Sequence, residues 1–505
     1  MRVVTPAKLL LGAFFCLLMS ALTANAKLAP ERWMRVTEEE RHQLIRAERY
    51  FDHKEFKSAL AEYELFLQLY AKSEVASYAQ FMFAECTRQL GQVNTAINEF
   101  RTVIDYFPDS IDAAAAQYSI GVCLNQGGDA EQAAKAFEKV VEKWPKEDFG
   151  ALARNELCAI YFRIGQIDKW LPHMQYLATG EYKDTQNLRN LAQQRLVMHW
   201  IEEHNPAEGF ALVSQAKKKD PLIVFAFWAA RAMQPMQGPQ AQNIQTLYGE
   251  KGKKALPALA SETVAFIEKQ PAADPAQKSL VDHWCARIFA NAGVTDKATE
   301  RFATLLKAHP EDDVLRSEYA SHLRDSRKFG EARLVFHEMK DAYTADREIA
   351  ETYLAENDAK SCVEAYQAML GKHADKVGEI QWRLGEVLQK NGRYQEAIAA
   401  YQQSNRDPAE LLRTAECQAS LKQYTAAIQT LVGVINFFKD AAPEAQYRIA
   451  DYQAAKGDKD AAIRTLKTVC KVYLSTPWAG RAHQDLSLKY GVDVTLGGAA
   501  KKDDK

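Results

Sequence analysis

The stretch IGVCLNQGGDAEQAAKAFEKVVEKWP, residues 120–145, decides the fold of this chain. Counted from the small residue Gly121, the offsets 7, 12, 16 and 24 carry Gly128, Ala133, Phe137 and Pro145. Each position has a role in two helices packed antiparallel. The glycine ends the first helix at a positive φ, the alanine allows close approach, the ring fills the gap one turn later, and the proline stops the second helix. The stretch therefore predicts one helical hairpin.

The same offsets recur along the chain. Two further units keep all four, and partial copies begin at seven other small residues. The complete copies are Ala84, Gly91, Ala96, Phe100, Pro108 and Ala286, Gly293, Ala298, Phe302, Pro310; the partial ones start at Ala47, Cys158, Ala320, Ala350, Gly385, Ala415 and Ala450. From Ala47 through Ala84 and Gly121 to Cys158, each copy starts 37 residues after the one before it. From Ala286 onward, successive copies start 30 to 35 residues apart. A fixed period of this length predicts an array of stacked hairpins.

The frame resembles the tetratricopeptide repeat (TPR) family over about residues 46–184 and 278–474. The resemblance implies an all-α fold, a right-handed TPR superhelix (an α-solenoid) of about ten or more helical hairpins with an irregular helical middle segment. It also implies a concave, protein-binding groove lined by the first helix of each hairpin. We therefore expect an N-terminal TPR array over 27–184, a degenerate helical segment or hinge over 185–277, a C-terminal TPR array with a capping helix over 278–491, and a disordered tail over 492–505.

The first 26 residues are typical of a secretory signal peptide. Arg2 and Lys8 precede an apolar run over residues 9–22, and Ala24-Asn25-Ala26 is a small-residue cleavage site. The run is too short to span a bilayer, and no later stretch is apolar enough, so we expect no transmembrane segment in the mature chain. Cleavage near Ala26 predicts an exported bacterial protein, periplasmic or secreted. The stretch 477–491 resembles the ends of periplasmic TPR proteins involved in cell-division coordination and outer-membrane assembly.

Composition and motifs argue against a catalytic, metal-binding or nucleic-acid-binding protein. The 505 residues are 47% hydrophobic with a formal net charge of −2, which does not favour nucleic acid. Seven cysteines remain after cleavage, without a C-x-x-C pair, and are expected to be core residues. We find no nucleotide loop, nucleophile elbow or zinc helix, and His199 and His204 are expected at the surface. We expect no enzyme and no cofactor.

The family resemblance also assigns partner-binding residues. In TPR proteins, positions three before, one after and four after the small residue of the first helix face the groove. Aromatic and polar side chains there suit an extended or helical peptide; the alternative is that some of these rings pack between neighbouring repeats. The predicted groove residues are Tyr78, Phe81, Glu85, Arg88, Tyr118, Asn125, Asn155, Phe162, Arg163, Trp382, Glu386 and Tyr447.

The sequence therefore predicts a non-catalytic exported TPR scaffold that binds a protein or peptide partner in cell-envelope assembly or maintenance. Two alternatives remain open at this point. The chain could be an accessory subunit of a cell-wall or secretion enzyme complex, or a self-assembling structural protein built by stacking of repeats.

Overall fold

The structure, a computed structural model, describes residue 28 and residues 30–182, 184, 187–216, 218–235 and 244–494. Within those residues it consists of 26 α-helices and one short 3-10 helix, without a strand. The predicted all-α class is therefore confirmed. The predicted signal peptide and residues 495–505 of the predicted tail over 492–505 lie outside the described residues. The first residues of that predicted tail are described, and Val492 and Val494 pack against the last hydrophobic cluster of the chain.

The chain divides into two compact units, Met1–Arg301 and Phe302–Lys505. The boundary lies in α16 (Thr295–Ala308). Unit 1 contains α2 (Pro30–Trp33), α3 (Glu38–Asp52), α4 (Phe56–Leu69), α5 (Ala76–Gln89), α6 (Val93–Tyr106), α7 (Ile111–Gln126), α8 (Ala130–Lys143), α9 (Asp148–Ile164), α10 (Ile167–Thr179), α11 (Leu188–Glu202), α12 (Pro206–Gln215), α13 (Pro221–Met233), α14 (Ile244–Glu268) and α15 (Pro275–Asn291). Unit 2 contains α17 (Asp313–Asp325), α18 (Phe329–His337), α19 (Ala342–Ala355), α20 (Ala359–Lys372), η3 (Ala374–Lys376), α21 (Val377–Lys390), α22 (Tyr394–Gln402), α23 (Ala409–Ser420), α24 (Tyr424–Phe437), α25 (Ala442–Lys456), α26 (Lys459–Val472) and α27 (Pro477–Tyr490).

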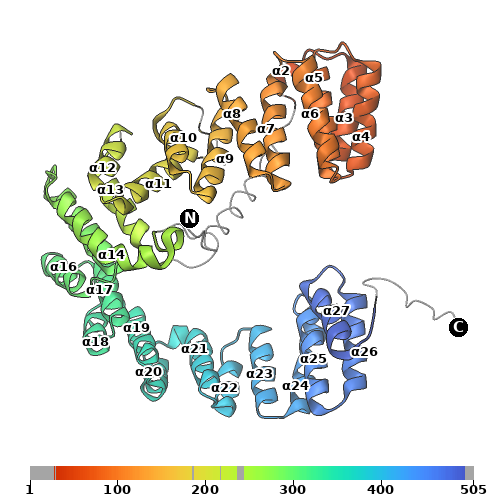
Figure 1. The fold of residues 1–505 in the computed structure, drawn as a ribbon. Helices are drawn as coiled ribbons and strands as arrows, with labels where there is room; N and C mark the ends of the chain where they lie inside the picture. The colour runs from red at the N-terminus through yellow and green to blue at the C-terminus, as the bar shows by residue number, and fades with distance from the viewer. Residues whose placement is uncertain are drawn as a thin grey trace. The chain divides into compact units, whose positions relative to one another are not determined.

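Within each unit the helices follow the topology of a solenoid. From α3 to α12, and again from α17 to α27, each helix packs against the next one in the chain (Figure 1). First helices also touch the first helices of the neighbouring hairpins, as α5 does with α7 and α7 with α9. The odd-numbered helices α3 to α11 and α17 to α25 are called first helices below.

The turn inside each hairpin confirms the offset of 7. Every glycine predicted there has a positive φ, as in Gly91 (79°), Gly128 (86°) and Gly392 (73°). Where the repeat lacks glycine, the residue at the same offset adopts the left-handed conformation regardless: Lys54, Arg327, Asn357 and Lys422, with φ between 61° and 67°. The hairpin geometry, rather than the residue type, therefore sets the backbone at this position.

The small residue and the aromatic ring sixteen positions later make the tightest packing of the hairpin. A Cβ atom placed on Gly121 would lie 2.6 Å from the Phe137 ring, and one on Gly385 would lie 2.7 Å from the Tyr401 ring. Both rings are completely buried. The first helix therefore approaches the second as closely as a missing methyl group permits.

The predicted degenerate segment contains one more hairpin in the same frame. Val197 is fully buried in α11, His204 has a positive φ of 59° at the offset of 7, and Gly209 takes the alanine position at the offset of 12. Beyond it the order changes, because α13 packs against α15 as well as against α14. The apolar stretch 222–233 forms α13 and is largely buried, as its sequence predicts.

The seven cysteines described are all free and buried, which confirms the prediction that they are core residues. His199 is a correction. It was expected at the surface, but its side chain is buried, with its ring 5.1 Å from the rings of Trp170 and Trp200. Helix α11 packs against α10, α12, α13 and α14, and none of its residues is fully exposed, so His199 lies among neighbouring helices. Among the described helices, none is both long and apolar enough to cross a membrane.

Candidate functional site

All twelve predicted groove residues lie in first helices, where the repeat frame places them. They fall into an aromatic set in α5, α7 and α9, a polar set from α5 to α9, and a set in α21 and α25. Their exposure and their contacts within the chain show which of them are accessible to another protein.

The predicted aromatic residues of α5 and α7 are almost entirely enclosed. Phe81 is 6% exposed and packs against the Phe100 ring at 5.5 Å. Tyr118 is 3% exposed between the rings of Phe137 and Phe149, at 5.3 and 5.6 Å. Tyr78 is also 3% exposed. These rings fill the space between helices, so they present little area to a peptide.

Three polar contacts join one repeat of unit 1 to the next. The Tyr78 hydroxyl donates to Glu48 Oε1 at 2.7 Å, and the Tyr118 hydroxyl lies 3.5 Å from Glu156 Oε1. The Arg163 guanidinium donates to Asn125 Oδ1 at 3.1 Å. The predicted residues Tyr78, Tyr118, Asn125 and Arg163 therefore tie neighbouring first helices together.

The remaining predicted residues of unit 1 also have local roles. Arg88 Nε donates to the buried carboxylate of Glu85 at 2.8 Å. Phe162 is half-buried, with its ring 6.0 Å from that of Trp170, and Asn155 is 5% exposed. None of these side chains stands free on the surface.

Glu156 is a residue that the repeat frame did not single out. It is 5% exposed in α9, next to the Tyr118 hydroxyl. Burial raises its pKa to about 7, although the hydrogen bond from Tyr118 and the charge of Arg163 oppose the shift. The signal in the sequence is its distance of 38 residues from Tyr118, one repeat along, which Asn125 and Arg163 share.

Unit 2 leaves its predicted residues more accessible. Trp382 is half-buried, with the Tyr401 ring 5.2 Å away and the Arg406 guanidinium 5.4 Å from its centroid. Glu386 is half-buried and accepts from Arg383 Nη1 at 2.9 Å. The Tyr447 hydroxyl donates to Asp485 Oδ2 at 2.6 Å, again 38 residues along the chain. These side chains line the first helices and keep part of their surface in solvent.

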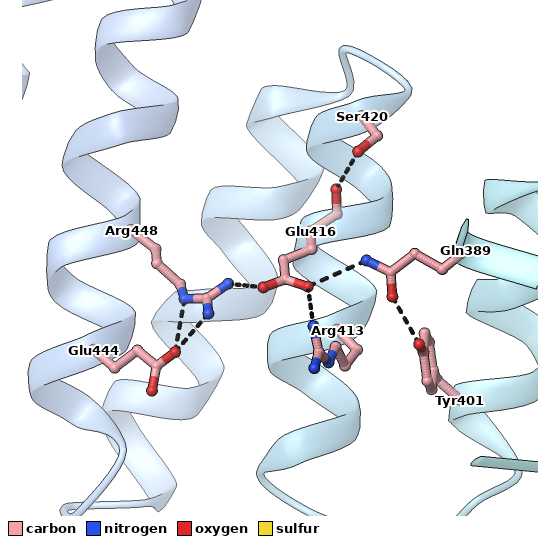
Figure 2. Close-up of polar contacts among 7 residues, drawn as sticks. All are labelled: Gln389, Tyr401, Arg413, Glu416, Ser420, Glu444 and Arg448. Atoms are coloured by element: carbon pink, nitrogen blue, oxygen red, sulfur yellow. Dashed lines mark hydrogen bonds and ion pairs between the residues drawn. The ribbon is translucent and has the colours of Figure 1, made fainter. Parts of the chain in front are cut away.

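A polar network joins three consecutive first helices of unit 2, and Glu416 is at its centre (Figure 2). Its carboxylate accepts from Arg413 Nη1 at 2.9 Å in α23, from Gln389 Nε2 at 3.2 Å in α21, and from the Arg448 guanidinium in α25. Arg448 Nε in turn donates to Glu444 Oε1 at 2.9 Å. One carboxylate thus receives donors from three helices.

The charges of the network reinforce one another. Burial alone would raise the pKa of Glu416, but hydrogen bonds from Arg448 and Arg413 hold that pKa below its ordinary value. Burial works against the charge of Arg448, yet its contacts with Glu416 and Glu444 raise the pKa of its guanidinium. Glu416 and Arg448 therefore remain ionised at neutral pH.

The network follows a rule that the sequence contains. In six repeats the residue directly after the small mid-helix residue is acidic: Glu48, Glu85, Glu351, Glu386, Glu416 and Asp451. In unit 2 an arginine two positions before the small residue often accompanies it: Arg383, Arg413 and Arg448. The pairing of these two positions on successive turns explains the i,i+3 ion pairs Arg383–Glu386 and Arg413–Glu416.

The described residues contain no cluster of three or more His, Cys, Asp or Glu side chains placed to hold a metal ion. The first helices offer fixed charges, amides and ring faces along a row of repeats, and these groups are suited to binding another polypeptide. Such groups recognise a polypeptide through ion pairs and aromatic contacts.

Comparisons with known proteins agree with the repeat frame. A tetratricopeptide repeat family model matches residues 87–148 and 347–410, and a second tetratricopeptide repeat model matches residues 444–473. The chain therefore carries TPR repeats in both units. No curated protein matches it significantly.

Three solved structures align over most of the chain at low similarity. The crystal structure of the APC/C hetero-tetramer Cut9–Hcn1 is 14% identical, with a TM-score of 0.27, over 88% of this chain and 96% of that one. Yeast Tom70 is 12% identical, with a TM-score of 0.27, over 88% and 95%. Naa15/Naa10 bound to HypK-THB is 12% identical, with a TM-score of 0.35, over 92% and 69%.

Proposed function

We propose that this chain is an exported, non-catalytic TPR scaffold that binds a protein partner through its first helices, in the assembly or maintenance of a bacterial cell envelope. The observation that carries the proposal is the row of charged and aromatic side chains on α21, α23 and α25. We call Trp382, Arg383, Glu386, Arg413 and Tyr447 the unit 2 first-helix surface.

The exposure of this surface supports a role in binding. The side chains of Arg383 and Arg413 are 50% and 44% exposed, although each pairs with a glutamate one turn along its own helix. The ion pairs of such exposed arginines contribute little to stability, so a partner can bind either arginine at small cost. Charged residues of a scaffold that stabilise it weakly are well suited to steer and orient a charged partner.

Unit 1 is the weaker candidate for the same role. Its predicted aromatic anchors Phe81 and Tyr118 are enclosed by the protein itself. A Phe81→Ala or Tyr118→Ala variant would therefore test packing rather than partner binding.

Export and the envelope role rest on the sequence of the first 26 residues. The positive start, the apolar run and Ala24-Asn25-Ala26 are the support for them. The test is N-terminal sequencing of the protein purified from its native cells together with fractionation. We expect a mature chain that starts at Lys27 in the periplasm or medium; an intact Met1 in the cytosol would refute export.

The partner is tested with two matched charge reversals. Arg383 pairs with Glu386 on a first helix, and Arg393 pairs with Glu396 at the start of the second helix α22, with the same i,i+3 spacing. We would crosslink intact cells expressing the wild type, Arg383→Glu or Arg393→Glu, and identify the crosslinked proteins by mass spectrometry. The proposal expects that Arg383→Glu loses a partner that the wild type and Arg393→Glu retain.

The other outcomes decide between the remaining functions. Equal crosslinking in all three proteins would exclude the unit 2 first-helix surface. A cell-wall or secretion enzyme as the lost partner would identify an accessory subunit. Crosslinks only to other copies of this chain, with a mass in solution that rises with concentration, would favour a self-assembling structural protein.

A further inference from the structure

A short segment before the first hairpin packs onto the first helices of unit 1. We call residue 28 and residues 30–36, which include α2, the N-terminal arm. Leu28 and Val36 are buried, at 4% and 6% exposure, in the same hydrophobic cluster as Tyr78 and Phe81. Trp33 is half-buried against that cluster. The arm therefore covers surface that the repeat frame assigns to a partner.

One arginine anchors the arm. Arg32 Nη1 donates to Asp112 Oδ1 at 3.0 Å, and Nη2 donates to Asp112 Oδ2 at 2.9 Å. Nη2 also donates to Ser77 Oγ at 3.3 Å, and the guanidinium lies 5.8 Å from the Tyr78 ring centroid. Ser77 Oγ donates to Asp112 Oδ2 at 2.6 Å. The guanidinium thus meets a carboxylate, a hydroxyl and a ring face at once.

These three receiving groups come from two neighbouring repeats. Ser77 and Tyr78 lie in the first turn of α5, and Asp112 lies in the first turn of α7. Asp112 is 8% exposed, and the salt bridge that the structure gives it is with Arg32. A buried carboxylate requires a cation, and two parallel N–H···O bonds select the planar fork of arginine over the point charge of lysine.

The remainder of the arm has few contacts besides two hydrogen bonds from Arg41 Nη2, to the Trp33 carbonyl at 3.0 Å and to the Val36 carbonyl at 3.4 Å. Helix α2 is a single turn of four residues, none of which is buried. Met34 is 78% exposed, and the pair Arg35–Glu74, at 3.7 Å, has both side chains about two-thirds exposed. Such a pair contributes little, so the attachment depends on the side chains of Arg32, Leu28, Val36 and Trp33 and on the hydrogen bonds from Arg41.

We propose that Ser77, Tyr78 and Asp112 form an arginine-binding site, which the N-terminal arm fills within the chain and which accepts an arginine-bearing segment of a partner protein when the arm leaves. This proposal rests on the proposed function in one respect: it takes the partner to be a protein, and it adds that the partner presents an arginine. Because the site lies in unit 1, it stands or fails separately from the unit 2 first-helix surface.

The test uses a labelled synthetic peptide with the sequence of residues 28–36, LAPERWMRV. It is titrated against the full chain and against a full-chain Leu28→Ala/Arg32→Ala variant, and fluorescence anisotropy reports binding. A tethered arm competes at an effective concentration in the millimolar range, so the wild type should exclude the peptide. We expect binding to the variant to be at least tenfold tighter than to the wild type.

Two substitutions show whether the arginine contact is the cause. A peptide with Arg32→Ala, or an added Asp112→Asn change in the protein, should reduce binding at least tenfold. A peptide with Arg32→Lys should bind several-fold more weakly, because lysine cannot make the bidentate pair. Circular dichroism and thermal unfolding of each protein establish that it remains folded.

The results that would overturn the proposal are equally definite. If the folded Leu28→Ala/Arg32→Ala protein does not bind the peptide, the arm is only a structural cap. If binding is unchanged by Asp112→Asn, or if the lysine peptide binds as well as the arginine peptide, the site is not an arginine-binding site. Since the probe is a segment of this chain, none of these results depends on finding a cellular partner.

Discussion

The two units share one repeat frame but join their repeats in different ways. In unit 1, ten of the sixteen residues of α7 are buried, including a run of four alanines from Ala113 to Ala116. In unit 2, three of the twelve residues of α23 are buried, and the carboxylate of Glu416 on this helix accepts hydrogen bonds from α21 and α25 in addition to apolar contacts. The comparison shows that the frame specifies the hairpin, whereas the proportion of apolar and ionic contacts between hairpins varies along the chain.

If the hairpin is common to both units, its central ring should be equally important in both. Phe137 and Phe336 occupy the offset of 16 in units 1 and 2, and both are completely buried. We expect Phe137→Ala and Phe336→Ala each to cost about 3–5 kcal/mol of local stability, because each leaves a cavity between two helices. Hydrogen exchange of the affected hairpin measures this. A cost confined to one unit would break the comparison.

The two interfaces should respond to pH in opposite directions. The pKa of Glu156 is raised from its ordinary value of 4.5 to about 7 in the folded unit 1, so the native state holds its proton more tightly than the unfolded chain. Its contribution is complete below pH 4.5 and is lost as the pH rises through about 7, by roughly 3 kcal/mol. Glu416 has a lowered pKa, so its contribution is present above pH 4.5 and is lost as the pH falls.

The measurement is hydrogen exchange of α9 and α23 between pH 4 and pH 8, corrected for the intrinsic exchange rate. The control is Glu156→Gln, which should remove most of the loss in α9 with rising pH and leave α23 unchanged. If α9 in the wild type becomes more protected as the pH rises, the assignment of Glu156 is wrong.

Close approach within the hairpin can be tested with glycines alone. A methyl group on Gly385 would meet the Tyr401 ring at 2.7 Å, whereas one on Gly433, inside α24, has nothing within 4 Å. We expect Gly385→Ala to cost about 1–3 kcal/mol through overpacking. Gly433→Ala should instead gain about 0.5–1 kcal/mol, because alanine favours a helix. Chemical denaturation followed by circular dichroism compares the two, and a gain for both would refute the packing argument.

The smallest expected effect is a difference in salt dependence between the contacts that join repeats in unit 1 and those in unit 2. Glu416→Gln keeps the shape of the side chain but removes the charge that pairs with Arg413 and Arg448, at an expected cost of about 1–2 kcal/mol. That cost should shrink as salt is raised, because the pairs are partly exposed. The cost of Phe81→Ala in unit 1 should stay the same as salt is raised, because Phe81 makes apolar contacts. Denaturation of both variants at low and high ionic strength provides the comparison, and equal salt dependence would contradict it.

The sequence predicts the hairpins well because their marks are local. The offset of 7 correctly locates the left-handed glycine of the hairpin turn, and the offset of 16 locates the buried ring. These positions are set by two helices adjacent in the chain. The periodicity of one helix is enough to predict them.

The site was harder to predict because residues with the same spacing on a first helix can either pack against the neighbouring repeat or lie in solvent. Periodicity alone does not separate the two faces, so Phe81 and Tyr118 were assigned to a groove although the chain encloses them. The 38-residue spacing of Tyr118 with Glu156, and of Tyr447 with Asp485, is the signal that could have separated them. Nothing in the repeat frame indicates the arm, because Arg32 and Asp112 are 80 residues apart.

The left-handed turn has a consequence for engineering this chain. Five of its turns hold Lys54, His204, Arg327, Asn357 and Lys422, all exposed, in a conformation that costs a side-chain-bearing residue about 1 kcal/mol. The fold tolerates that cost five times over, so the array is less thermostable than its own geometry permits. Consensus glycines at these turns would give a designer a stabilised array whose first-helix surfaces remain untouched.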